Sequence, residues 1–570
     1  MLTGIYNQIR TTFRPKLFDL FTGKEPYNRQ LFASDLTAGM VVGIVALPLA
    51  IAFGIASGVT PQQGIITAIV AGFLISFFGG SHFLIGGPTG AFIVIVYGIV
   101  QQYGINGLMV ATILAGVMLV IMGIFKLGTI IKYIPYPIIV GFTSGIAVVI
   151  FSTQVGDFFG LGIAHQPADF IPKWGIIFRH AGNMDVWTTL MSLLTVAIIF
   201  IWPRFNKKLP GSLIALVVVT GISLLLAHFA FIQVDTIGTK FPQLTGAIAL
   251  PKAEAPNINM EAIRHLFQPA FTIALLCAIE SLLAAMVADG VTGKKHNSNT
   301  ELIGQGIANI VTPLFGGIPA TGAIARTMTN INNGGKTPVS GLVHAAALLL
   351  MLLFLMPYAV YIPLSCLAGI LVVVAYNMGE WRSFRYLLKG DKTDVAVLLV
   401  TFGLTVVIDL TIAIELGLVL AVVSFLKRIS ESSSIKAVER ELFASEHEEA
   451  TDPEALQIPS GVEVYEINGP FFFGIANKFE DVAHDVPHKK VKIRIIRMRK
   501  VPFIDSTGLN NLRNLWKRSK AHRIQIVLSG VNNQVRTSLE RSGFADELGQ
   551  EYICSHISEA MEKAQKMLLE

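Results

Sequence analysis

The chain has 570 residues and a formal net charge of +6; 52% of its residues are hydrophobic and only 14% are charged. Soluble globular domains carry about 25% charged residues, so this composition argues against a wholly soluble protein. The basic residues of the apolar part lie in short loops, which indicates membrane topology rather than binding to nucleic acid.

The apolar segments end near residue 428 and soluble levels of charge follow, so the chain has two regions suited to two different solvents. The N-terminal segment is polar and basic and no apolar stretch begins before Leu36, so we expect no cleaved signal peptide. Cys277, Cys366 and Cys554 have neither metal-ligand spacing nor the pattern of a disulfide framework. We expect them to be packing residues, and we expect no metal site.

Apolar runs recur along the membrane region, where a spanning helix needs about 20 mostly apolar residues. About fourteen spans are predicted, near 36–57, 63–79, 88–101, 107–125, 134–152, 186–202, 211–228, 268–288, 298–315, 321–333, 339–357, 360–376, 394–410 and 412–427. The segments 88–101 and 321–333 are too short to cross a bilayer alone. Basic residues such as Lys126, Arg204 and Lys294 follow even-numbered spans, which predicts that both termini are cytoplasmic.

The same motif precedes or opens both short spans. Phe-Gly-Gly at 78–80 is followed by Thr-Gly-Ala at 89–91, and Phe-Gly-Gly at 315–317 is followed by Thr-Gly-Ala at 321–323. The third and tenth spans correspond if the chain consists of two repeats of seven, and because seven is odd the second repeat must be inverted. Paired short segments interrupted by Gly or Pro at matching positions indicate a transporter's substrate site.

A helix that begins at the bilayer midplane presents its first free N–H groups there, and its dipole adds about half a positive charge. Two such helix starts that face each other form an anion site without any formal charge. The alternative is that these glycines only allow close helix packing. Recurrence of the motif at matched positions favours the anion site.

Two ionisable side chains lie within predicted spans, where such groups are functional candidates by default. Arg326 lies about one turn into the second short helix and has a planar donor fork suited to an oxyanion; its alternative role is to pair helices or to reach the interface. Glu280 lies in an apolar span and could carry a proton, because desolvation favours its neutral form; the alternative is a permanent ion pair with Arg326. Phe53 is a candidate apolar wall of the site, with core packing as its default role.

The region after residue 428 alternates in pattern as a small α/β domain does. Residues 429–460 are rich in Ser, Glu and Ala and are interpreted as a helical tether. Beyond 460 the pattern predicts strands at 462–467, 491–498 and 524–528 and helices at 474–483 and 535–542. Asp505 or Ser506 is placed to cap a helix that begins there. The basic run 489–500 is typical of a solvated strand face or of a contact with anionic headgroups or an acidic partner.

The chain resembles the SulP (sulfate permease) family of anion transporters over nearly its whole length. The membrane region matches at Gly-Phe-Thr-Ser-Gly 141–145, Asn-Thr-Glu-Leu 299–302, the run 315–327 and Gly-Gly-Lys-Thr 334–337. Gly-Pro-Phe-Phe-Phe-Gly 469–474 and Asp-Ser-Thr-Gly-Leu 505–509 resemble the family's STAS domain.

The resemblance implies a seven-plus-seven inverted repeat with a core and a gate domain, elevator-like movement of the core, and a homodimer. It implies an anion between the starts of the third and tenth helices. By motif position the site would comprise Phe53, Thr89, Gly90, Ala91, Gly322, Ala323, Ile324 and Arg326, with Glu280 as the coupling residue. Ser506 stands where related soluble STAS proteins are phosphorylated, and capping is its alternative role.

Some positions depart from parts of the family. Leu49 and Ala325 replace polar residues that some members carry, which argues against an animal-type chloride exchange or motor role. Sodium-coupled bicarbonate relatives tend to have Asp where this chain has Glu280, so Glu280 favours proton coupling. Sulfate and C4-dicarboxylate are both compatible with the motif at 318–327.

We therefore expect an α-helical polytopic membrane protein with a small cytoplasmic α/β STAS domain: a cytoplasmic segment 1–35, a transporter domain 36–428, a linker 429–460 and the STAS domain 461–570. The expected function is secondary active transport of sulfate or a dicarboxylate across a bacterial inner membrane, coupled to H⁺ (or Na⁺), with no cofactor and no enzymatic activity.

The alternatives are an anion exchanger, a bicarbonate transporter, a nucleobase transporter and a membrane-anchored STAS scaffold for a cytosolic partner. Arg326 favours an anion over a nucleobase. The sequence contains no Walker-type ATP-binding motif, which argues against an ATP-driven pump.

Overall fold

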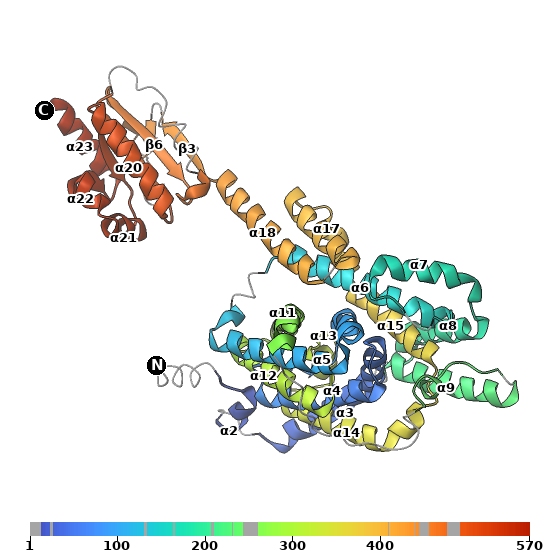
Figure 1. Cartoon of the computed structure of the whole chain (residues 1–570). Helices are drawn as coiled ribbons and strands as arrows, with labels where there is room; N and C mark the ends of the chain where they lie inside the picture. Colours follow the sequence, from blue (N-terminus) through green and yellow to red (C-terminus); the bar gives the residue numbers. More distant parts are fainter. Residues whose placement is uncertain are drawn as a thin grey trace. The chain divides into compact units, whose positions relative to one another are not determined.

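The computed structural model describes residues 13–22, 27–129, 134–163, 166–206, 210–230, 232–242, 260–408, 410–438, 441–443, 455–475 and 491–570. Contacts divide the chain into two compact units, Met1–Leu418 and Val419–Glu570. The first unit is helical and the second combines a sheet with helices (Figure 1). The division falls within helix α18 (Leu410–Ser432), as does the predicted boundary near residue 428.

Each predicted span has a helical counterpart. These helices are α3 (Arg29–Ala56), α4 (Pro61–Phe78), α5 (Ile93–Ile124), α6 (Tyr136–Phe159), α8 (Val186–Ile201), α9 (Gly211–Phe229), α11 (Met260–Thr292), α12 (Ser298–Val311), α13 (Ile324–Asn332), α14 (Val339–Ala359), α15 (Leu364–Met378), α17 (Lys392–Val407) and α18. Within the described ranges, nine helical segments are long and apolar enough to cross a membrane. The third and fourth predicted spans are joined in α5, which bends at Gly104, where φ is 68°, a value that glycine adopts readily.

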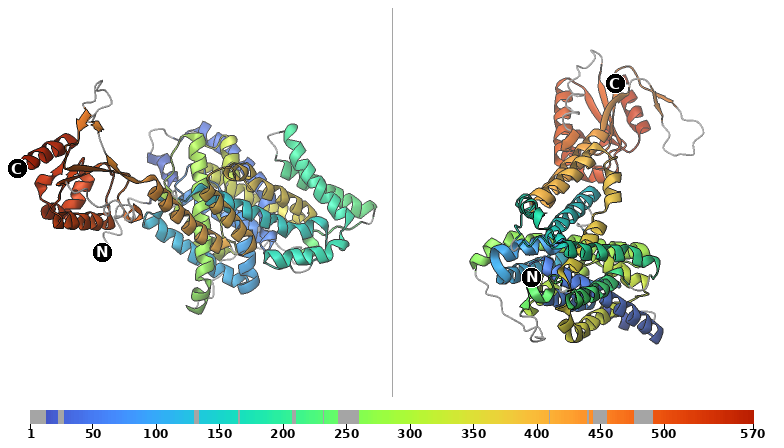
Figure 2. Two further views of the ribbon diagram at one scale, coloured as in Figure 1. Left: turned by 90° about the horizontal axis from the view of Figure 1, so that it is seen from above. Right: turned by 90° about the vertical axis from the view of Figure 1, so that its right-hand side faces the viewer.

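The helices of the first unit pack in two groups. One contains α3, α4, α5, α11, α12, α13 and α14, and the other contains α6, α8, α9, α15 and α17. Contacts between the groups run mainly from α15 and α9 to α3. The short helix α7 (Phe170–His180) lies with α8 and α9 at one side of this unit (Figures 1 and 2). The grouping matches the predicted division into core and gate domains.

Small residues allow the core helices to touch. At the crossing of α5 and α12, a Cβ atom on Gly116 would lie 2.7 Å from the carbonyl oxygen of Gly306, and one on Gly306 would lie 2.6 Å from that of Gly116. Helix association in a membrane depends on such close packing, because lipid is as apolar as the side chains. Close packing by glycine is therefore present in this chain, and it includes the first Phe-Gly-Gly motif, where a Cβ atom on Gly80 would overlap the carbonyl oxygen of Asn297.

The second unit is built on a five-stranded sheet in the order β3 (Ser434–Val438), β6 (Val462–Asn468), β7 (Ile493–Lys500), β8 (Gln525–Ser529) and β9 (Ile553–Cys554). Strand β3 is antiparallel to β6 and the other pairs are parallel. Helices α20 (Ser506–Ala521), α21 (Asn533–Arg541), α22 (Phe544–Leu548) and α23 (Ile557–Leu569) pack on it. The predicted strands are confirmed.

The expected helical tether is wrong at 434–438. Helix α18 ends at Ser432, and Ser434–Val438 instead pairs with β6, so it supplies an edge strand of the sheet. Of the predicted helix 474–483, Phe473–Ile475 forms a 3-10 turn, and 476–490 lies outside the described residues.

Part of the basic run is neutralised on β7 within the sheet. Arg494 is buried and its guanidinium lies 3.0 Å from the carboxylate of Glu463, and Arg497 lies 3.8 Å from that of Glu466. The prediction of a solvated strand face is wrong at these two arginines, because both are buried and paired with carboxylates of the neighbouring strand β6. The cross-strand pairs also leave less free charge for headgroups.

Asp505 caps α20, as one of the two predicted alternatives requires. Its carboxylate accepts hydrogen bonds from the backbone N–H groups of Gly508, at 2.7 Å, and Phe473, at 3.1 Å. Ser506 is exposed in the first turn of the helix. The three cysteines are buried and free, as expected for packing residues, and burial raises the pKa of the Cys554 thiol to about 11.

Substitution Glu463→Gln removes the charge that neutralises buried Arg494, so we expect a loss of about 1–3 kcal/mol in local stability. Hydrogen exchange of the β7 amides in the full-length protein measures it. Glu562→Gln, at an exposed position of α23, is the control. Equal exchange in the two variants would mean that the ion pair contributes no stability.

Candidate functional site

The two repeated motifs meet in the first unit. Strand β1 (Gly86–Gly87) pairs antiparallel with β2 (Thr321–Gly322), with Gly86 opposite Gly322. The backbone N–H of Ala323 donates to the carbonyl of Ile85 at 3.0 Å and extends this pairing. Antiparallel contact between equivalent segments is the geometry that an inverted repeat produces, so the correspondence read from the sequence has a direct structural counterpart.

A helix begins immediately after each of the two strands. The 3-10 turn η2 (Gly90–Phe92) leads into α5, and α13 begins at Ile324. Neither N-cap residue, Thr89 or Ala323, makes a side-chain hydrogen bond to its helix start. The first N–H groups of both helices are therefore not capped by these side chains, which is the arrangement that suits an anion.

Polar side chains from neighbouring helices hold the extended segment before α13. The amide of Asn309 both donates to the carbonyl of Ala320, at 2.8 Å, and accepts from its N–H, at 2.9 Å. The hydroxyl of Ser281 accepts from the N–H of Gly322 at 3.1 Å. Backbone that is not helical survives at membrane depth only where such groups are satisfied by protein.

The guanidinium of Arg326 crosses to the other repeat. One of its Nη atoms donates to the carbonyl of Pro88 at 2.6 Å, and only 4% of the residue is exposed. Gly87 has φ of 146°, and a Cβ atom there would overlap the guanidinium. Apart from Pro88, none of the described residues forms a hydrogen bond or ion pair with this side chain, which leaves most of its five donors for a ligand.

Glu280 faces the same place without pairing with Arg326. Its carboxylate accepts a hydrogen bond from the hydroxyl of Thr89 at 3.1 Å. Within the described part of the chain no nitrogen–oxygen distance of 4.0 Å or less joins Glu280 and Arg326. The alternative of a direct structural ion pair is therefore not what the structure contains.

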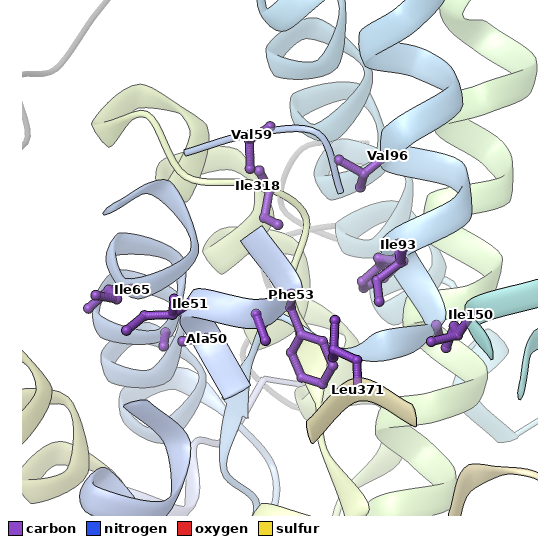
Figure 3. Packing of buried hydrophobic residues seen from close by; sticks show 14 of the residues in the cluster. Ala50, Ile51, Phe53, Val59, Ile65, Ile93, Val96, Ile150, Ile318 and Leu371 are labelled. Carbon is purple, nitrogen blue, oxygen red and sulfur yellow. The ribbon is translucent and has the colours of Figure 1, made fainter. Parts of the chain in front are cut away.

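An apolar wall closes one side of the site. Phe53 of α3 is 6% exposed, and Figure 3 shows its ring near Leu371, with Ile93 and Ile150 beyond. A Cβ atom on Gly90 would lie 2.8 Å from the sulfur of Met378, 3.2 Å from Ile150 and 3.5 Å from Phe53. The start of α5 therefore lies directly against this wall, and a larger residue at position 90 requires the side chain of Met378 to move.

The structure brings most of the predicted site residues together. Thr89, Gly90, Gly322, Ala323, Glu280 and Arg326 surround the crossing, and Ala91 is buried behind it. Ile324 differs, because the residue is 43% exposed and its side chain does not form a wall of the site.

Sequence reasoning missed several members of the site. The polarity of Asn309 and Ser281 within apolar spans could have identified these two residues. Ile150 and Met378 carry no such signal. His344 was also missed; it is fully buried against Gly72, and neither ring nitrogen has a hydrogen-bond partner in the described ranges.

Two helix interruptions, one in each inverted repeat, pair with each other in a helical unit that has core and gate groups. This arrangement defines a membrane transporter of the inverted-repeat class. The chain belongs to the sulfate permease family: the model of that family matches residues 32–401, and the STAS domain model matches 455–564. The protein is thus a multi-pass membrane anion transporter of this family with a C-terminal STAS domain, as the sequence predicted.

The chain is 42% identical to the putative sulfate transporter YvdB of Bacillus subtilis over 541 residues, which cover 95% of this chain and 99% of that protein. It is 31% identical to the bicarbonate transporter BicA of a Picosynechococcus species, with 89% of this chain and 90% of that protein covered.

Solved structures give the same fold. The transmembrane domain of a cyanobacterium bicarbonate transporter BicA matches with a TM-score of 0.61 and 31% identity, covering 70% of this chain and 98% of that one. The overall structure of SLC26A9 matches with a TM-score of 0.83 over 99% of this chain and 94% of that one. The SLC26A9 match, at 17% identity, shows the fold alone.

The crossing makes Gly87→Ala a sensitive test of the site. A methyl group at this backbone conformation costs about 1–3 kcal/mol and displaces the guanidinium of Arg326, so we expect at least about a tenfold loss of anion binding. Equilibrium binding to the purified protein measures it. The control is Gly98→Ala on α5, where a Cβ atom meets nothing within 4 Å. Equal affinity in both variants would contradict the placement of Arg326.

Proposed function

We propose that the protein is a secondary active transporter that takes up a small oxyanion together with a proton, and that the anion binds between the starts of α5 and α13 against Arg326. One observation carries the proposal: a buried guanidinium, with Pro88 as its one hydrogen-bond partner among the described residues, lies beside two helix starts without side-chain caps. A buried charge is costly unless it is paired, so this site favours an anion.

Sulfate is the first candidate substrate. It is supported by the sulfate permease family itself and by the putative sulfate transporter that is 42% identical. A tetrahedral dianion matches the remaining donors of Arg326 and the N–H groups of two helices. A C4-dicarboxylate uses the same donors and is part of the same proposal.

Bicarbonate is the second candidate, and charge balance favours it. With Arg326 charged and Glu280 ionised, the empty site has no net charge. A monovalent anion together with one proton on Glu280 also leaves no net charge, whereas sulfate leaves one negative charge. Carrying a net charge through a membrane is costly, so an equal charge before and after loading favours movement of both forms. A relative at 31% identity is a bicarbonate transporter.

Glu280 is proposed as the proton-coupling residue. Its carboxylate accepts a hydrogen bond from Thr89, the N-cap of the turn η2 that leads into α5, so a change of its protonation reaches the anion site through one hydrogen bond. The two helix groups support an elevator-like movement of the core against the gate. We further propose a homodimer in a bacterial inner membrane with both termini cytoplasmic, and regulation through the STAS domain, with Ser506 as an accessible phosphorylation site.

Substitution Arg326→Ala removes the charge that binds the anion, so we expect counterflow of sulfate to fall by at least about tenfold. Proteoliposomes loaded with unlabelled sulfate, bicarbonate or succinate measure it and identify the substrate. Arg385→Ala, at an exposed position of α16 (Trp381–Leu387), controls for loss of a positive charge. Unchanged counterflow in Arg326→Ala, or binding of uracil and of no anion, would contradict the site.

Substitution Glu280→Gln keeps the hydrogen-bond acceptor for Thr89 but cannot change its charge. We expect anion exchange to persist and accumulation driven by an inward proton gradient to disappear. The comparison of counterflow with gradient-driven uptake measures this, and Glu415→Gln at an exposed position of α18 is the control. Proton-driven accumulation by Glu280→Gln would assign coupling to another group.

A further inference from the structure

A polar cavity lies beyond the apolar wall. Its volume is about 250 Å³, and we call it the vestibule, defined by Tyr97, Gln101, Gln154, Gln166, Lys173 and Lys240. The end of α3, the first half of α5, the end of α6 and the short helix α7 contribute to it. The Lys and Arg distribution places this face outside the cell.

The vestibule continues the helix faces that enclose the central site. Ala56, which lines it, lies one turn beyond Phe53 on α3; Tyr97 lies one turn beyond Ile93 on α5. Gln154 follows Ile150 by one turn on α6. One turn is about 5 Å, so on each of these three helices the vestibule lies about one turn beyond a residue of the apolar wall. Figure 3 shows Phe53, Ile93 and Ile150 of that wall.

Lys173 lines the vestibule without a direct ion pair to any described residue. The residue is only 2% exposed, and its ammonium makes no hydrogen bond or ion pair to any residue that the structure describes. Burial lowers the pKa of Lys173 to about 8, against a smaller opposite effect of Asp169. Lys240, by contrast, lies 3.6 Å from the carboxylate of Asp157.

The surroundings of Lys173 are suited to a small anion. Gln101 and Gln166 offer amide groups, and no amide hydrogen bond is formed by either within the described ranges. The pair of Lys240 and Asp157 is neutral, so the ammonium of Lys173 sets a charge of +1 for the cavity. Sites for drug-sized ligands measure about 300–1,000 Å³, so this one suits a few-atom oxyanion.

We propose that the vestibule is a second anion-binding site, in which Lys173 with Gln101 and Gln166 holds the transported oxyanion on the outer side before it passes the apolar wall. The proposal rests on the proposed transport function and adds a residue that sets affinity for the external anion only. The vestibule takes the same class of ligand as the central site, an oxyanion such as sulfate or bicarbonate.

Zero-trans kinetics in vesicles of both orientations test the vestibule. For Lys173→Gln we expect the KM for external sulfate to rise at least about fivefold, as for loss of a charge-assisted hydrogen bond, with kcat unchanged and the KM for sulfate from the cytoplasmic side unchanged. Lys173→Arg should restore the external KM. The matched control is Arg179→Gln, which removes an exposed positive charge from the same helix.

Three results would overturn the proposal: equal KM changes on both sides, a fall in kcat alone, or the same external change in Arg179→Gln. The first two indicate a structural role for Lys173, and the third indicates general surface attraction.

A binding experiment separates the vestibule from the central site. In full-length Arg326→Ala we expect calorimetry with sulfate to show a residual weak site that the added Lys173→Gln removes. Absence of any residual binding would overturn the vestibule. If Arg326→Ala transports normally while Lys173→Gln still raises the external KM, the central site is wrong and the vestibule stands.

Discussion

The contact between the guanidinium of Arg326 and the carbonyl of Pro88 is the constraint on which the membrane unit depends. It joins the second repeat to the first where β1 and β2 interrupt the regular helix of both repeats. A positive charge at this depth requires an environment of donors and acceptors already in position, because no water is there to adjust. Several otherwise separate features follow from that requirement.

The first is the distribution of glycine. Gly87 leaves room for the guanidinium and Gly90 leaves room for the apolar wall, so the same short segment is relieved of side chains on two sides for two different reasons. The second is the use of polar residues in α11 and α12. Ser281 and Asn309 replace the hydrogen bonds that the segment before α13 gives up when it becomes extended. A rigid frame of this kind can move as one body, since its internal hydrogen bonds do not depend on the gate helices.

Much of this could be predicted from the sequence because it depends on local pattern. Apolar runs of sufficient length gave the helices, and repetition of Phe-Gly-Gly and Thr-Gly-Ala identified the crossing. Contacts between segments that are far apart in the sequence could not be predicted in this way. Ile150 and Met378 are ordinary apolar residues whose role follows only from the packing of α6 and α15 against α5. Strand β3 was read as part of a helical tether because it lies in the stretch 429–460, which is rich in Ser, Glu and Ala. Its pairing with β6 is decided by the sheet.

Lys173 shows how sequence reasoning passes over a residue of this kind. It lies in a short amphipathic helix outside the predicted spans, where a lysine is expected to face water, and only the packing of α7 buries it. Lys173 then lines a cavity that lies about one helical turn beyond Phe53 and Ile150, which Figure 3 shows among the apolar residues. An anion that enters the vestibule exchanges its water shell for contacts with Lys173, and later for contacts with Arg326. The part of its path without water or a cationic partner is therefore reduced to the apolar layer between the two sites. That thin layer is enough to block free diffusion of the ion and small enough for a movement of the core to carry the anion across it.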